Sequence, residues 1–80
     1  MDKRKQAAGL RAMNAAAEWL QANDIDFDQL TAYHIKIGPV NFWPNTGTIM
    51  VDGEDRRRPE RGLEGLEEVL LKLHVIEPAL

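Results

Sequence analysis

Four arginines lie close together in one short segment: Arg56, Arg57, Arg58 and Arg61. Because guanidinium groups bind phosphate oxygens bidentately, these residues form a candidate phosphate-binding site. No aromatic residue is interleaved with them, and Glu54, Asp55 and Glu60 partly neutralise the segment, which favours a solvated loop. The net charge of −3 also argues against binding of nucleic acid by the whole surface.

The acidic residues and histidines are candidates for metal chemistry. Asp24, Asp26 and Asp28 have the spacing that begins a calcium loop, but Gln29 and Ile35 stand where such a loop needs glycine and glutamate. This run is therefore predicted to be a solvated turn. His34 and His74 are far apart in the chain and are predicted to lie in different layers, which excludes a shared metal.

The chain has no cysteine and no serine, which excludes thiolate metal sites, disulfides and the commonest hydroxyl nucleophile. No set of nucleophile, base and orienting residue can be assembled from the remaining side chains. The sequence therefore predicts no catalytic residue, no cofactor and no metal site, and the protein is expected to be non-enzymatic.

The stretch between Thr31 and Asp52 organises the rest of the chain. Gly38-Pro39 suits a two-residue hairpin turn, and residues 44–47 (PNTG) form a four-residue turn, which predicts strands at about 32–37, 40–43 and 48–52. The first turn pairs Ile37 with Val40, Lys36 with Asn41, Ile35 with Phe42 and His34 with Trp43. The second pairs Trp43 with Thr48, Phe42 with Ile49, Asn41 with Met50 and Val40 with Val51.

Because side chains alternate along a strand, this register sorts them onto two faces. The core face is predicted to contain Tyr33, Ile35, Ile37, Val40, Phe42, Ile49 and Val51. The opposite face, called the outer face below, is predicted to contain His34, Lys36, Asn41, Trp43, Thr48, Met50 and Asp52. A slip of one residue in either turn would mix apolar and polar side chains on both faces.

Apolar residues at helical spacing predict one helix on each side of this stretch. The first, at about 5–23, has a stripe of Leu10, Met13, Ala17 and Leu20, with Trp19 at its edge. Ile25 and Phe27 follow it and are expected to pack under the sheet. The second, at about 62–74, follows a basic, exposed loop at 53–61 and has a stripe of Leu63, Leu66, Leu70 and Leu73, widened by Val69.

The predicted fold is a single α+β domain over residues 1–80, with two layers in the order α-β-β-β-α. Its three strands form an antiparallel meander, and both helices pack on one face. This arrangement buries both helical stripes against the core face and leaves the outer face open.

Two resemblances bear on function. The segment NFWPNTGTIMVDG, with the charged loop and the leucine-striped helix after it, resembles small phage or prophage proteins of unknown function that have an aromatic-Pro-x-Thr-Gly turn. That resemblance covers about residues 33–73 and implies a bacterial or phage origin. The order of elements is similar to double-stranded RNA-binding domains, but Glu64, Glu67 and Glu68 stand where those domains have a lysine-rich helix start.

The function predicted from the sequence is a small binding module that contacts a protein partner, or a second copy of itself, through the outer face. Tryptophan beside methionine on an open sheet is typical of partner-binding surfaces. The partner-binding residues are predicted to be Trp43, Met50, His34, Lys36, Asn41 and Thr48. The alternative is a nucleic-acid-associated protein that uses the four arginines with Lys36 and the basic N-terminus, which contains Lys3, Arg4, Lys5 and Arg11. No apolar run is long enough to span a membrane, and the expected location is the cytoplasm.

Overall fold

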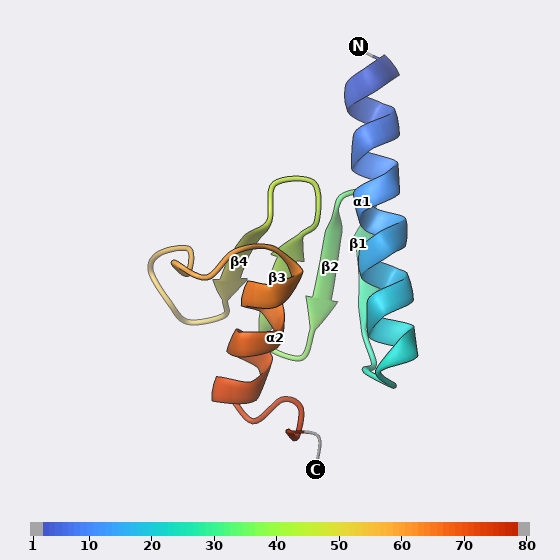
Figure 1. Ribbon diagram of the computed structural model, residues 1–80. Helices are drawn as coiled ribbons and strands as arrows, with labels where there is room; N and C mark the ends of the chain where they lie inside the picture. Colours follow the sequence, from blue (N-terminus) through green and yellow to red (C-terminus); the bar gives the residue numbers. More distant parts are fainter. Residues whose placement is uncertain (1–2, 79–80) are drawn as a thin grey trace.

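The structure is a computed structural model that describes residues 3–78 and the side chains of residues 9–78. The described residues form two helices and one antiparallel sheet (Figure 1), which confirms the α+β class. Along the chain the elements are α1 (Lys3–Ala22), β1 (Asp28–Thr31), β2 (His34–Ile37), β3 (Val40–Trp43), β4 (Thr48–Val51) and α2 (Gly62–Lys72). The strand order in the sheet is β1-β2-β3-β4, so each strand pairs with its neighbour in sequence.

The expected three-stranded sheet is wrong, because β1 adds a fourth strand at its edge. Its four residues are all exposed, so the strand has no apolar alternation by which the sequence could reveal it. β1 is held by backbone hydrogen bonds to β2. The register of this pairing shifts between Gln29 and Thr31, which indicates a bulge at Leu30. As a consequence Tyr33, predicted in a strand, lies in the turn between β1 and β2.

The predicted register of the other three strands is confirmed. Ile37 pairs with Val40, Ile35 with Phe42, Phe42 with Ile49 and Trp43 with Thr48, as the two turns require. Gly38 has a φ of +55°, which glycine adopts without the steric cost that a Cβ would impose.

The core consists of the predicted inward side chains of β2, β3 and β4 together with one stripe from each helix. Its members are Met13, Ala16, Leu20, Ile25, Ile35, Ile37, Val40, Phe42, Ile49, Val51, Leu66, Val69 and Leu70. Trp19 and Phe27 are partly buried against this cluster, as expected. In Figure 1, α2 crosses in front of β3 and β4, and α1 crosses in front of β1.

The expected stripe of α1 is confirmed at Met13 and Leu20, which are buried, and is wrong by one position at its two other members. Leu10 is 51% exposed and Ala17 is only partly buried, whereas their neighbours Gly9 and Ala16 are buried. A Cβ at Gly9 would lie 2.6 Å from Cε1 of Tyr33. The Tyr33 ring therefore occupies the place that a side chain at position 9 would need.

Both helices end with the same backbone motif. The N–H of Ile25 donates to the carbonyl of Leu20 at 2.9 Å, and the N–H of Val75 donates to the carbonyl of Leu70 at 2.9 Å. The residue just before each of these two donors has a positive φ, +55° at Asp24 and +56° at His74. This is the Schellman pattern, in which a left-handed residue ends the helix and an apolar residue after it returns to the core.

We predict that replacing His74 with glycine stabilises the protein by about 1 kcal/mol, because a side chain at positive φ costs more than glycine's extra freedom in the unfolded chain. Asp24→Gly should stabilise less, because aspartate tolerates this conformation better than histidine. Urea unfolding of the two variants beside wild type measures both effects. A loss of stability in His74→Gly would contradict the strain assigned to this position.

Candidate functional site

The outer face of the sheet forms two cross-strand rows. The pairings place Asp28, Lys36, Asn41 and Met50 in one row. In the other, Thr31 pairs with His34 and Trp43 with Thr48, and the His34 and Trp43 rings stack on each other. The six predicted partner-binding residues therefore lie on one continuous surface. The sequence did not indicate that Asp28 and Thr31 extend it, because it did not reveal β1.

An aromatic stack forms the apolar part of the outer face. The rings of His34 and Trp43 lie 4.3 Å apart between centroids and at 12° to one another. Both side chains are half-buried, whereas Phe42, the strand neighbour of Trp43, is 1% exposed in the core. The indole therefore lies on the outer face, where the register predicted it, and the imidazole restricts its orientation.

Asn41 lies at the centre of a polar network beside the stack. Its Oδ1 accepts from Nε2 of His34 at 3.0 Å and from Nζ of Lys36 at 3.5 Å. Its Nδ2 donates to the carbonyl of Met50 at 3.2 Å and to Oδ1 of Asp52 at 2.9 Å. Since the oxygen faces two donors and the nitrogen two acceptors, only one orientation of the amide satisfies all four contacts.

Asp52 closes this network through an ion pair with Lys36. The hydrogen bond from Lys36, followed by that from Asn41, lowers the pKa of the Asp52 carboxyl. The polar groups of the outer face thus bond to one another and hold Lys36 in place. Asp52 was predicted on this face but not as a site residue.

The four arginines have two different environments. Arg56 and Arg57 are exposed, and neither forms an ion pair with any residue in the range 9–78. Arg61 is also exposed, but its guanidinium donates to the carbonyl of Thr46 at 2.7 Å. Arg58 is half-buried within a group of five charged side chains. The side chains of Lys3, Arg4 and Lys5 lie outside the described part of the chain.

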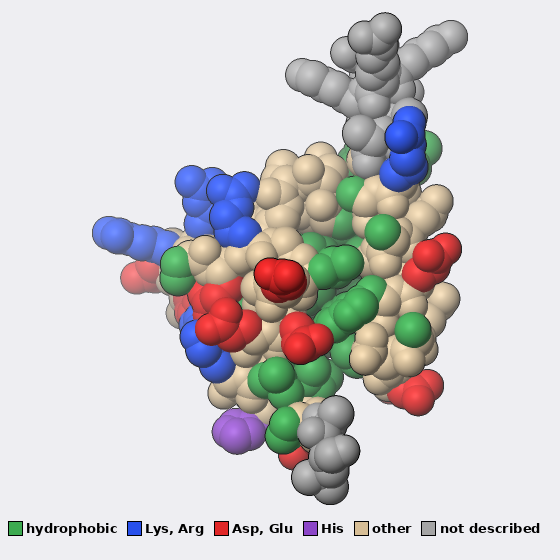
Figure 2. All heavy atoms as spheres, in the orientation of Figure 1, with side chains coloured by type: hydrophobic (Ala, Val, Ile, Leu, Met, Phe, Trp, Pro, Cys, Tyr) green, Lys and Arg blue, Asp and Glu red, His purple; other side chains and the backbone are tan. Residues whose placement is uncertain are grey.

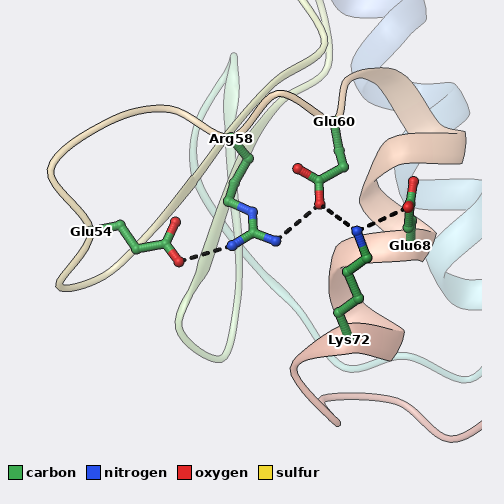
Figure 3. A network of polar contacts seen from close by, with 5 residues as sticks. All are labelled: Glu54, Arg58, Glu60, Glu68 and Lys72. Carbon is green, nitrogen blue, oxygen red and sulfur yellow. Dashed lines mark hydrogen bonds and ion pairs between the residues drawn. The ribbon is translucent and has the colours of Figure 1, made fainter.

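Figure 3 shows this group, the Glu60 ion-pair network, which consists of Glu54, Arg58, Glu60, Glu68 and Lys72. Oε2 of Glu60 accepts from Arg58 at 3.0 Å and from Lys72 at 3.3 Å. Arg58 also contacts Glu54 at 3.0 Å, and Lys72 contacts Glu68 at 3.0 Å. The side chain of Glu60 is only 8% exposed, so one nearly buried carboxylate connects the loop to α2.

Backbone hydrogen bonds hold the second half of the loop against β4, so the prediction of an exposed loop at 53–61 is only partly correct. The N–H of Arg58 donates to the carbonyl of Ile49 at 2.7 Å, and that of Gly62 donates to the carbonyl of Gly47 at 3.0 Å. Residues 58–62 therefore cover the free edge of β4. Two of the four arginines predicted to bind phosphate, Arg58 and Arg61, already bond to groups of this protein.

Over residues 3–78, no three His, Asp or Glu side chains are placed to hold a metal ion. Asp24, Asp26 and Asp28 are exposed, and Asp28 begins β1. Neither described helix has both the length and the apolar composition needed to cross a membrane.

We predict that Glu60→Gln destabilises the protein by about 1 to 3 kcal/mol, because it leaves Arg58 and Lys72 facing a neutral group in a nearly buried position. Glu68→Gln is the matched control, since it removes an exposed partner of the same Lys72 and should cost less than about 0.5 kcal/mol. Equilibrium unfolding at neutral pH compares the two. Equal effects would show that burial of Glu60 is unimportant.

The same carboxylate should give a pH signature. The hydrogen bond from Arg58 is the main cause that lowers the pKa of Glu60 from 4.5 to about 2. The unfolded chain binds this proton at a higher pH than the folded chain does, so stability is present above about pH 4.5 and decreases toward pH 2. Glu60→Gln should remove this part of the acid dependence, and a variant with the wild-type acid profile would contradict the assignment.

Comparison with known proteins identifies no match to this chain. No family model, no curated protein and no solved structure matches the chain. The resemblances to phage-encoded proteins and to double-stranded RNA-binding domains therefore stay predictions from the sequence. Function has to be inferred from the two surfaces just described, the outer face and the loop.

Proposed function

We propose that this protein is a small non-enzymatic binding module that associates with a second copy of itself through the outer face of its sheet. In this proposal both helices cover the opposite face, and Trp43 and Met50 are the apolar anchors. The stacking of Trp43 on His34 is the main supporting observation. An anchor that is already held in one orientation loses little conformational entropy when a partner binds it.

The composition of the outer face suits an interface. Tryptophan and methionine are enriched at the centres of protein interfaces, and polar groups surround such centres. Here the polar groups are Lys36, Asn41 and Asp52, which bond to one another and therefore enter an interface already paired. Burying these paired groups in an interface therefore avoids most of the free-energy cost of burying a polar group without a hydrogen-bond partner.

The charges of the face favour a second copy as the partner. A twofold interface brings the same patch of both molecules together, so that patch must complement itself. Asp28 and Lys36 are opposite each other across β1 and β2, and Asp52 is paired with Lys36. With both signs of charge on one surface, a twofold arrangement can place the lysine of each copy near the acids of the other.

We predict that the wild-type protein changes from monomer toward dimer between micromolar and millimolar concentrations. Trp43→Ala should weaken this association at least about 30-fold, because a central tryptophan contributes about 2 kcal/mol or more at such interfaces. Sedimentation velocity at several concentrations measures the change, with circular dichroism to verify that the variant folds.

Leu10→Ala is the control, because Leu10 is an exposed apolar side chain on α1 rather than on the outer face. It should leave the dimerisation unchanged. A wild-type protein that stays monomeric at millimolar concentration, or a Trp43→Ala variant that dimerises normally, would contradict the proposal.

A nucleic-acid-associated function is the second candidate, and the exposure of Arg56 and Arg57 favours it. Because Arg58 and Arg61 already bond to groups of this protein, this candidate depends on Arg56 and Arg57. We predict that any binding of a labelled DNA duplex decreases with salt with a logarithmic slope of about −2, one unit for each arginine. Arg56→Gln/Arg57→Gln should abolish this slope, whereas Lys72→Gln should preserve it, because Lys72 is already paired with Glu60 and Glu68; fluorescence anisotropy measures both.

A further inference from the structure

Two cavities lie side by side at the end of the molecule where the C-terminal segment passes between the helices. One has a volume of about 400 Å³ and lies near the end of α1 and the β2–β3 turn, and the other, about 170 Å³, lies between the end of α1 and α2. Both are lined by Ile76 and Glu77. We call the two together the C-terminal cleft.

Apolar side chains form part of the floor of the C-terminal cleft. Ile25 and Ile37 belong to the core, and Val75 and Ile76 are partly buried against it. Leu71 of α2 lines the smaller cavity. Figure 2 shows that hydrophobic side chains stay visible at the surface between α1 and α2 and continue toward the C-terminal segment. The apolar surface is thus elongated and lies between two helices.

The rim of the cleft is acidic. Four carboxylates line the two cavities, and no lysine or arginine does; they are Asp24, Asp26, Glu67 and Glu77. All four are exposed, and they come from four parts of the fold: the end of α1, the segment before β1, α2 and the C-terminal segment. Because these residues come from separate segments, their charge is distributed around the cleft. No three of them are placed to hold a metal ion within residues 3–78.

We propose that the C-terminal cleft binds an amphipathic helix of a partner protein whose polar face is basic. An elongated apolar surface between two helices matches the apolar stripe of a third helix, which inserts side chains at i, i+3 and i+4. Two neighbouring cavities provide places for two such side chains. The acidic rim favours lysine and arginine on the polar face of the partner and disfavours an acidic partner.

This site is separate from the outer face. The residues that line the cleft include none of the six on which the self-association depends, namely Trp43, Met50, His34, Lys36, Asn41 and Thr48. The module would therefore be able to dimerise through its sheet and bind a basic helix at the C-terminal cleft at the same time.

The experiment uses two labelled peptides that repeat leucine at helical spacing, one with lysine and one with glutamate at every polar position. Fluorescence anisotropy with the full chain should show binding of the leucine–lysine peptide and at least about tenfold weaker binding of the leucine–glutamate peptide. In a Trp43→Phe background Trp19 is the only tryptophan, and it lies one helical turn before Asn23, which lines the cleft. Its emission should shift when the peptide binds.

Paired charge reversals separate the cleft from general electrostatic attraction. Glu67→Lys/Glu77→Lys should weaken binding of the leucine–lysine peptide at least about tenfold, whereas Glu54→Lys/Asp55→Lys makes the same change in net charge in the loop, away from the cleft, and should change it by less than about twofold. Equal weakening by both pairs, equal binding of both peptides, or no binding at millimolar peptide would each overturn the proposal. None of these outcomes depends on whether Trp43 mediates a dimer.

Discussion

The strand register fixed by two turns is the constraint on which the rest of the structure depends. Because Ile37 pairs with Val40 across Gly38-Pro39, and Trp43 with Thr48 across the next turn, alternate side chains of three strands share one face. The core and the outer face follow from this single choice. A slip of one residue would bury Lys36 and Asn41 and expose Ile35 and Phe42, at a cost far beyond the stability of a chain this short.

The two edge strands of the sheet, β1 and β4, are protected in different ways. At β4, the backbone of residues 58–62 covers the edge, and the nearly buried carboxylate of Glu60 connects that segment to α2. At β1, all four residues are exposed, and a bulge at Leu30 interrupts the pairing. A short bulged edge strand is a common way of limiting unwanted strand pairing, which is consistent with the proposed association through side chains of the outer face rather than through an open edge.

Charge is distributed unevenly although the total is small. Arg61 is exposed near the turn that joins β3 to β4, Arg56 and Arg57 are exposed in the loop after β4, and an acidic rim lines the C-terminal cleft. The outer face has both signs, paired through Asn41. Partners of different chemistry would therefore be directed to different surfaces, since local potential rather than net charge steers an encounter.

The sequence by itself determined the α+β class, the two turns, the pairing of β2, β3 and β4, and the outward position of Trp43, because each depends on contacts between residues near in the chain. It did not reveal β1, whose exposed residues have no apolar pattern, nor the exposure of Leu10, which depends on where the Tyr33 ring meets Gly9. Only the tertiary structure decided that Glu60 pairs with both Arg58 and Lys72, and that Asp24, Asp26, Glu67 and Glu77 surround one cleft. The physical reason is that side-chain pairing and cavity shape arise where distant segments pack together, and periodicity within one segment contains no information about its neighbours.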